Sequence, residues 1–120
     1  MPYVDGFIVA VPKKNLAAYT RLSKKAGKIW REYGALDYRE WVAEDVKVGK
    51  LTSFPRAVKL KPGETVVFAW ITYKSRAQRD RINAKVMVDS RLKSMMGPDS
   101  KPPFDGKRMI YGGFASLVKV

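Results

Sequence analysis

Apolar and polar positions along the chain alternate in short runs that predict four β-strands. These runs are rich in β-branched and aromatic residues, and turn residues bound them. The expected strands span residues 3–11, 36–46, 65–73 and 107–120. The run TVVFAWITY at residues 65–73 has the strongest strand character in the chain.

Two stretches between these strands show the three- and four-residue spacing of an amphipathic helix. The first starts after Asn15, the expected N-cap, and ends at Gly34. Its apolar positions form one stripe: Leu16, Tyr19, Leu22, Ala26, Ile29, Trp30 and Tyr33. The second helix is expected from Ser75, as its N-cap, to Leu92.

The predicted order is therefore β-α-β-β-α-β, the split pattern of a ferredoxin-like α+β sandwich. A chain of 120 residues is one domain by length, and we expect that domain to span residues 1–120. The longest connection, residues 47–64, carries turn signals at Gly49, Pro55 and Pro62-Gly63. It is either a flexible excursion or a functional loop packed on the body.

Both faces of the expected sheet are apolar. In the third strand, Val66, Phe68 and Trp70 alternate with Val67, Ala69 and Ile71, which are equally apolar. Two helices cover only one face, so the other face needs a second cover. The pattern predicts a homodimer in which two sheets pack together as a dimeric α/β barrel. The alternatives are an open sheet with a ligand groove and a cover made by the long connection.

Composition narrows the chemistry. The chain has 24 Lys and Arg against 11 Asp and Glu, a formal charge of +13, and neither cysteine nor histidine. This excludes disulfides, thiolate nucleophiles, Cys/His zinc sites, His-ligated haem and Ser-His-Asp triads. We expect no cofactor and no metal, which leaves carboxylates, Tyr, Lys and Arg for chemistry. No leader segment or apolar run of about 20 residues is seen, so we expect a cytoplasmic protein without membrane contact.

Four strings make a family resemblance visible: YVDGF at 3–7, SFPRAV at 53–58, RDRINAKVM at 79–87 and PFDGKRMIYGGF at 103–114. Over nearly its whole length the chain resembles the YbaA-like family of unknown function, which is placed in the dimeric α/β-barrel superfamily. The resemblance implies the ferredoxin-like fold and the homodimer, and it implies no particular reaction.

Two activities of that superfamily can be compared with these residues. Relatives that degrade haem or process chlorite ligate iron through histidine, which this chain lacks. Cofactor-free, quinone-forming monooxygenases need only a pocket with Asn, Trp, Tyr or Arg side chains. Trp70, Tyr73, Asn83 and Tyr111 are available for such a pocket, but no spacing singles them out.

Arginines beside aspartates in the second helix form the first candidate site. Arg79 and Asp80, and further along Arg91, are placed so that a guanidinium held by a carboxylate presents its fork to a carboxylate or phosphate ligand. The same residues could instead lock the helix to the last loop through ion pairs.

The last loop and strand form the second candidate site. Phe104, Asp105 and Arg108 flank a turn, and Gly112-Gly113 interrupts an apolar strand. The two glycines indicate a bulge, a close approach of another backbone in a paired-sheet dimer, or a ligand pocket. The residues expected to line such a pocket are Arg108, Tyr111, Gly112, Gly113 and Phe114.

Glu40 stands among apolar neighbours in the second strand, on one face with Tyr38 and Val42. A carboxyl in such surroundings is a candidate general base with a raised pKa. In the alternative interpretation, Glu40 is paired with an arginine or exposed to solvent.

These observations give two main hypotheses of function. The first is a homodimer that binds a small acidic or phosphorylated metabolite near Arg79, Arg91 and Arg108, with acid–base or cofactor-free oxidation as the available chemistry. The second is an RNA-associated accessory protein that uses the basic face of the first helix: Lys24, Lys25, Lys28 and Arg31. Weak, non-specific nucleic-acid binding is expected from the net charge alone. A homodimer without a ligand is a third hypothesis.

Overall fold

The computed structural model describes residues 1–97 and 100–120 and builds an α+β fold around one antiparallel sheet. Its strands are β1 (Tyr3–Pro12), β2 (Asp37–Val42), β3 (Glu64–Tyr73) and β4 (Ile110–Ala115). Its helices are α1 (Leu16–Glu32), α2 (Phe54–Ala57), α3 (Arg76–Met87) and α4 (Ser90–Met96), with 3-10 turns η1 (Lys13–Asn15) and η2 (Gly106–Arg108).

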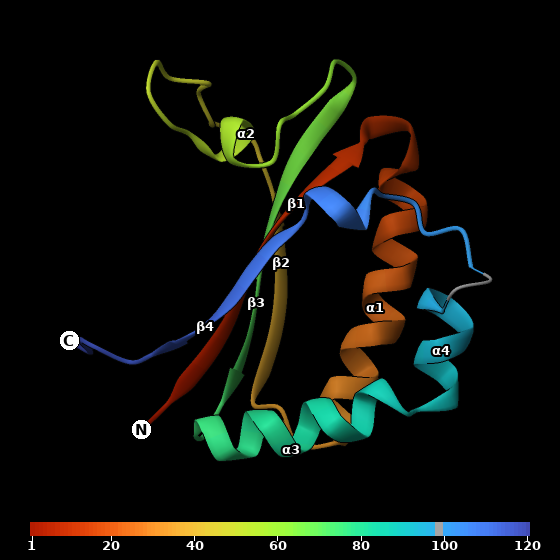
Figure 1. Cartoon of the computed structure of the whole chain (residues 1–120), viewed down its shortest axis with the longest axis vertical. Helices are drawn as coiled ribbons and strands as arrows, with labels where there is room; N and C mark the ends of the chain where they lie inside the picture. Colours follow the sequence, from red (N-terminus) through yellow and green to blue (C-terminus); the bar gives the residue numbers. More distant parts are fainter. Residues whose placement is uncertain (98–99) are drawn as a thin grey trace.

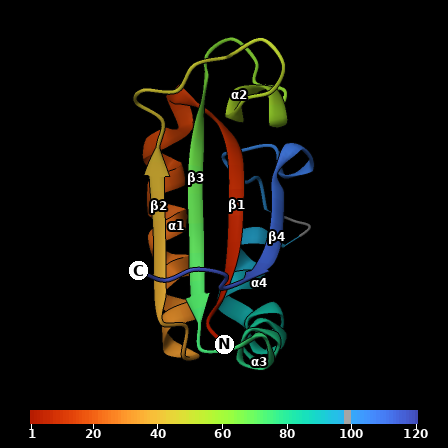
Figure 2. The same ribbon diagram turned by 90° about the vertical axis from the view of Figure 1, so that its left-hand side faces the viewer.

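The strand order β2-β3-β1-β4 confirms the predicted ferredoxin-like fold. β1 and β3 form the centre and pair along their full length, from Tyr3 opposite Tyr73 to Pro12 opposite Glu64. β2 and β4 are the edges, as Figure 2 shows. Figure 1 shows α1, α3 and α4 on one side of the sheet. We call this side the helix face and the other the open face.

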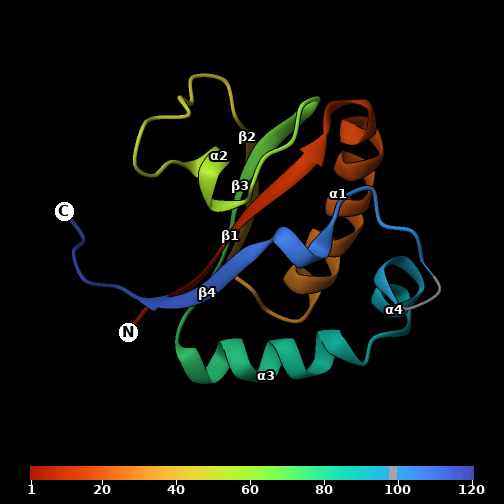
Figure 3. The ribbon, with the colours of Figure 1, turned by 45° about the horizontal axis from the view of Figure 1, so that its top comes forward.

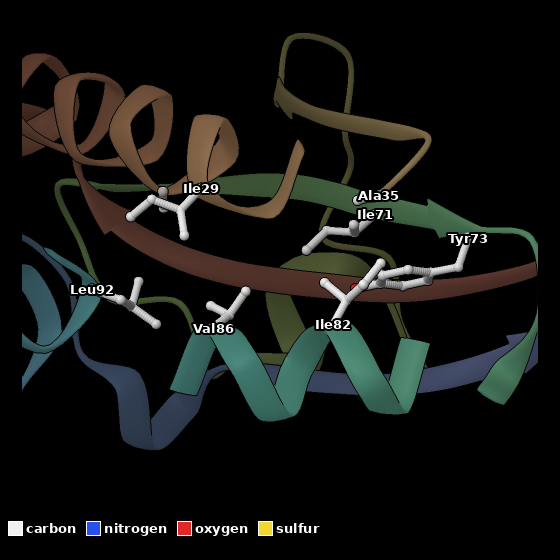
Figure 4. Close-up of a cluster of buried hydrophobic side chains, with 8 residues drawn as sticks. Ile29, Ala35, Ile71, Tyr73, Ile82, Val86 and Leu92 are labelled. Carbon is white, nitrogen blue, oxygen red and sulfur yellow. The ribbon is translucent and has the colours of Figure 1, made fainter. Parts of the chain in front are cut away.

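Strand periodicity assigns each side chain to one of these faces. On β1, Asp5, Phe7 and Val9 point to the helix face, whereas Val4 and Ile8 point to the open face. The main core cluster packs the end of the sheet that holds Ile71 and Tyr73 against α1, α3 and α4 (Figure 4). Its buried members are Ala26, Ile29, Ala35, Ile71, Tyr73, Ile82, Val86 and Leu92.

The connection at residues 47–64 packs on the body from α2 onward. Figure 3 shows α2 at one end of the open face. Val58, which follows α2, is fully buried against Ala10 and Val66. Ser53 caps α2 by accepting a hydrogen bond from the Arg56 amide. The connection therefore covers only one end of the open face.

Three boundaries differ from those expected. The helix expected over residues 75–92 is two helices, because Asp89 is extended and accepts a hydrogen bond from the Arg91 amide to start α4. β2 ends at Val42 instead of residue 46, and β4 covers 110–115 instead of 107–120, since residues 106–108 form η2. Part of the expected loop at 97–106, residues 98 and 99, lies outside the described residues.

Both predicted N-cap positions are confirmed, but the side chain caps the helix at only one of them. Ser75 caps α3 by accepting a hydrogen bond from the Gln78 amide. Asn15 makes no side-chain cap, because its amide group donates to the carbonyl of Pro103 at 3.2 Å. Asn15 instead ties the start of α1 to the last loop.

One glycine of the pair in β4, Gly113, is explained by a neighbouring aromatic ring. β1 and β4 pair in unbroken register from Tyr3–Ala115 to Ile8–Ile110, so there is no bulge in this ladder. A Cβ at Gly113 would lie 2.7 Å from Cε2 of Tyr3. At Gly112 the nearest atom to a Cβ would be Phe114 Cε1 at 3.8 Å, an ordinary contact.

We expect Gly113→Ala to destabilise the fold by about 1–3 kcal/mol, because the Tyr3 ring must leave its place between β4 and α3. Gly112→Ala is the matched control, and we expect it to be neutral or slightly stabilising because alanine suits a strand better than glycine. Urea unfolding of both variants measures the difference. Equal stability of the two would contradict this explanation of Gly113.

Candidate functional site

A cavity of about 540 Å³ lies between the helix face of the sheet and the helices. This volume is in the range of small-molecule sites. Its walls are mainly apolar and aromatic, with contributions from β1, α1, α3, α4 and the last loop. Prominent lining residues are Phe7, Val9, Leu22, Trp30, Met87, Phe104 and Tyr111.

Glu40 forms the first polar group in this cavity. Its carboxylate accepts hydrogen bonds from the hydroxyls of Tyr19 and Ser23, one turn apart on α1, and from Tyr38 on β2 at 3.0 Å. No cation pairs with it among the residues that the structure describes. Glu40 and its three hydroxyl donors are called the Glu40 cluster below.

Burial raises the pKa of Glu40 above its ordinary value of 4.5, although the hydroxyls of Tyr19 and Tyr38 oppose the shift. Burial and the nearby Glu40 charge also raise the pKa of Tyr19 and of Tyr38. The two phenols therefore stay protonated and act as hydrogen-bond donors, while Glu40 is the group of the cluster that exchanges a proton most readily.

Asp5 and Arg79 form the second polar group. Asp5 is 5% exposed, and its Oδ1 accepts from Nη1 of Arg79 at 3.0 Å. Its Oδ2 is contacted by the hydroxyl of Tyr73 at 3.2 Å and the amide of Asn83 at 3.5 Å. The Arg79 guanidinium also lies over the Tyr3 ring, 5.0 Å from its centroid.

This network reaches α1 as well. The indole of Trp30 donates to Asn83 Oδ1 at 3.0 Å. Nε of Arg79 makes no hydrogen bond, although Asp80 Oδ1 lies 2.9 Å from it. On the sheet, Asp5 and Glu40 lie on strands that have β3 between them. They are two strand spacings, about 10 Å, apart across the sheet and two residues, about 7 Å, apart along it. The side of the cavity formed by the sheet thus carries two separate polar groups, the Glu40 cluster and the Asp5–Arg79 network.

The structure brings three of the ten expected ligand-binding residues to this cavity: Arg79, Phe104 and Tyr111. The Phe104 ring packs edge-on against Tyr19, and Tyr111 stacks on Phe7. Asp80 pairs with Arg79 and Arg76 on the exposed side of α3. Gly112 and Phe114 point to the open face, and Gly113 adjoins Tyr3.

The three arginines expected to converge on one ligand do not meet. Arg91 pairs with Glu32 and Asp89 at 2.8 and 3.1 Å, outside the cavity lining. Arg108 pairs with Glu64 at 2.6 Å and with Asp105 at 3.1 Å. It also donates to the carbonyl oxygen of residue 59, which fastens the segment after α2 to η2, the turn before β4. Each guanidinium therefore has an architectural partner.

The basic residues of α1 divide into two sets. Lys24, Lys28 and Arg31 line an open groove of about 970 Å³ between α1 and β2, whereas Lys25 does not line it. Arg31 is partly engaged, because it donates to the carbonyls of Ala35 and Leu36.

Sequence reasoning singled out Glu40 but missed the hydroxyls around it. Tyr19 and Ser23 are four residues apart on α1, and Tyr38 and Glu40 are two apart on β2. Each pair shares one face of its element, which was readable from the periodicity. The contact between the two pairs depends on the packing of α1 on β2, which no local pattern predicts.

Within the described ranges, no three acidic side chains gather to hold a metal ion, and no helix is long and apolar enough to cross a membrane.

Known proteins match the chain over most of its length. The model of the family described as "Protein of unknown function (DUF1428)" matches residues 2–106. The chain is 49% identical over 118 residues to the uncharacterized protein YbaA of Escherichia coli K12, covering 98% of each chain. A YbaA protein of Shigella flexneri matches to the same extent.

Two solved structures share the fold at low sequence identity. Rv0793 from Mycobacterium tuberculosis aligns with a TM-score of 0.55 at 15% identity, covering 99% of this chain and 98% of that chain. A dimeric ferredoxin-like protein from an uncultured marine organism aligns with a TM-score of 0.58 at 13% identity, covering all of both chains. At these identities the likeness shows the fold alone.

The raised pKa of Glu40 predicts a specific pH dependence of stability. The folded state binds the Glu40 proton more tightly than the unfolded state, so this contribution to stability is present at low pH and is lost as pH rises from about 4.5 through the folded pKa. We expect the stability of the native chain relative to Glu40→Gln to fall as pH increases over this window.

Urea unfolding in buffers from about pH 4 to about pH 8 measures this difference. Glu44→Gln is the control, because Glu44 is an exposed carboxyl beyond the end of β2. A constant difference between the native chain and Glu40→Gln across the range would contradict the raised pKa.

Proposed function

The chain belongs to the DUF1428 family of proteins of unknown function, and we propose that it binds a small, largely apolar molecule in the cavity between sheet and helices and exchanges a proton with it at Glu40. The observation that carries the proposal is the Glu40 cluster. A carboxylate that has no cation partner among the described residues, and that three hydroxyls hold, lines a mainly apolar and aromatic cavity.

The cluster has the properties of a general base. The hydroxyls of Tyr19, Ser23 and Tyr38 hold the carboxylate in one orientation, and burial raises the pKa of Glu40 towards the pH at which a base works best. Asp5 is less suited to this role, because Arg79 neutralises it. Proton transfer at Glu40 needs no metal or cofactor.

The lining favours a neutral weak acid over a phosphorylated ligand. Its charged side chains are two cations, Arg79 and Lys93, and two carboxylates, Asp5 and Glu40. The lining therefore carries no net positive charge when Glu40 is ionised, and the Arg79 fork is already engaged by Asp5. A phenol or an enol offers an apolar body for the aromatic walls and one acidic proton for Glu40.

We also propose that a second copy of the chain covers the open face. Exposed apolar side chains gather there, with Trp41 47%, Phe68 39% and Phe114 62% exposed. The strands contribute one charged pair to this face, Asp37 with Arg39. A monomer rarely exposes such a surface. The C-terminal residues 116–120 extend away from the sheet on this side (Figure 1), and Leu117 is 94% exposed.

RNA binding is the less favoured alternative. Single-stranded nucleic acid needs stacking platforms beside a cationic track. Phe54 and Phe68 lie at the open face, across the sheet from the lysines of α1, whereas Trp41 also lines the groove beside Lys24 and Lys28. A single exposed ring beside the lysines, among the described residues, is less than the row of rings on which successive bases stack.

The cavity proposal is tested with 4-nitrophenol, whose absorbance reports its ionisation. We expect the native chain to bind this probe and to shift its spectrum towards the phenolate, because Glu40 accepts the phenol proton. Glu40→Gln is expected to bind within about threefold of the native affinity without the spectral shift. Glu44→Gln serves as the control and should behave like the native chain. Absence of binding, or an equal shift in Glu40→Gln, would count against the proposal.

The dimer proposal is tested by placing a charge on the open face. We expect the native chain to have a dimeric mass at micromolar concentration and Phe114→Lys to be monomeric, because the lysine ammonium would be buried without a partner. Val88→Lys adds the same charge on the helix side and should stay dimeric, since Val88 lies between α3 and α4. Native mass spectrometry distinguishes the species, and a monomeric native chain would refute the dimer.

A further inference from the structure

The groove between α1 and β2 lies outside the proposed ligand cavity and has features of its own. It is open to solvent, and its apolar lining includes Leu16, Val42 and Val67. The Glu40 cluster forms the wall that the groove and the cavity share, because Tyr19, Ser23, Tyr38 and Glu40 line both.

One side of the groove is a lysine stripe. Thr20, Lys24 and Lys28 follow each other at four-residue spacing on α1. Among the described residues, neither lysine has a carboxylate within ion-pair distance.

The acidic residues of the groove are all occupied. Glu32 pairs with Arg91, Asp37 pairs with Arg39, and Glu40 is held by its hydroxyl donors. Lys24 and Lys28 thus have neither a carboxylate nor a carbonyl partner among the described residues, whereas the third cation of the groove, Arg31, donates to the carbonyls of Ala35 and Leu36.

The other side of the groove is the outer edge of β2, a terminal strand of the sheet. The amide of Ala43 donates to the carbonyl of Val66, which fixes the odd-numbered residues of β2 as those that bond to β3. The backbone groups of Tyr38, Glu40 and Val42 consequently point outward. An edge of this kind accepts a further strand.

The geometry points to a docking site for an extended acidic peptide segment, which we propose adds as a strand to the outer edge of β2 with its carboxylates on Lys24 and Lys28. Alternate side chains of a strand are about 6.6 Å apart. Two helix residues four positions apart are separated by about 6 Å along the axis. A peptide strand with an acidic residue at every second position therefore places its carboxylates at the spacing of the two lysines while its backbone pairs with β2.

A nucleic acid would satisfy the lysines but not the edge. Its phosphates are acceptors only and cannot pair with the outward carbonyls of Tyr38, Glu40 and Val42. Its donors lie on the bases and the 2′-hydroxyls and do not alternate with acceptors at the spacing of a strand edge. The backbone of a peptide offers a donor and an acceptor at every second residue, as this edge requires.

The test uses a synthetic peptide in which Glu alternates with Val and Thr, titrated into the native chain and followed by amide NMR shifts and calorimetry. We expect shifts at Tyr38, Glu40 and Val42. Lys24→Glu with Lys28→Glu should weaken binding by about tenfold or more. The charge-matched control, Arg21→Glu with Lys25→Glu, alters residues outside the groove lining and should weaken it by at most about threefold.

Two further probes test the strand pairing. Methylation of alternate peptide nitrogens should abolish binding, because it removes the donors that face β2. Val42→Pro should weaken binding while the fold persists, since it removes an outward N–H that β3 does not use.

Several results would overturn the proposal. These are no binding by the native chain, equal weakening by the two double variants, undiminished binding of the methylated peptide, or shifts that centre on the open face. An oligouridine that shifts the same β2 amides and displaces the peptide would assign the groove to nucleic acid instead.

Discussion

The ion pair between Asp5 and Arg79 is the centre of a polar network that joins β1, β3, α3 and α1. Asp5 lies on the central strand β1, and Arg79 reaches it from α3 at 3.0 Å. The second oxygen of Asp5 is contacted by Tyr73 of β3 and by Asn83 of α3, and Asn83 accepts a hydrogen bond from Trp30 of α1. Removing one partner from a buried pair costs about 3–5 kcal/mol, a large part of the stability of a small domain. The cavity depends on this pair because it holds α3 at its distance from the sheet.

The two carboxylates of the helix face are stabilised in different ways, and this difference separates architecture from chemistry. Asp5 has a cation, so its negative charge is neutralised within the fold. Glu40 has only hydroxyl donors, and burial raises its pKa. A carboxylate that is half-buried, oriented and without a cation partner gains a proton at lower free-energy cost than one held in an ion pair. The proposed proton transfer therefore belongs to β2, at the edge of the sheet, and not to its centre.

Much of the fold was readable from the sequence, whereas the partners of the charged residues were not. Period-two alternation predicted the strands and the two apolar faces, and a helical stripe predicted α1, because these signals are local. Arg79 and Asp5 are 74 residues apart, and Arg108 meets Glu64 across 44, so no local pattern pairs them. The break between α3 and α4 was missed because Asp89 both continues the helical pattern and suits an N-cap. The expected cluster of arginines failed for the same reason: each arginine had an acidic partner distant in sequence.

The separation of apolar and basic surfaces explains how so cationic a chain is compatible with self-association. Each copy carries a formal charge of +13, and two copies repel each other unless their charges lie far apart. The lysines of α1 lie on the helix side of the sheet, whereas Trp41, Phe68 and Phe114 lie on the open face. Two copies joined through their open faces would place both α1 helices on the outside, separated by two sheets and screened by salt beyond about 8–10 Å. Such an assembly would leave the groove beside β2 on its outer, cationic side. An acidic peptide bound there would also lower the repulsion between the copies, because its carboxylates offset part of the positive charge.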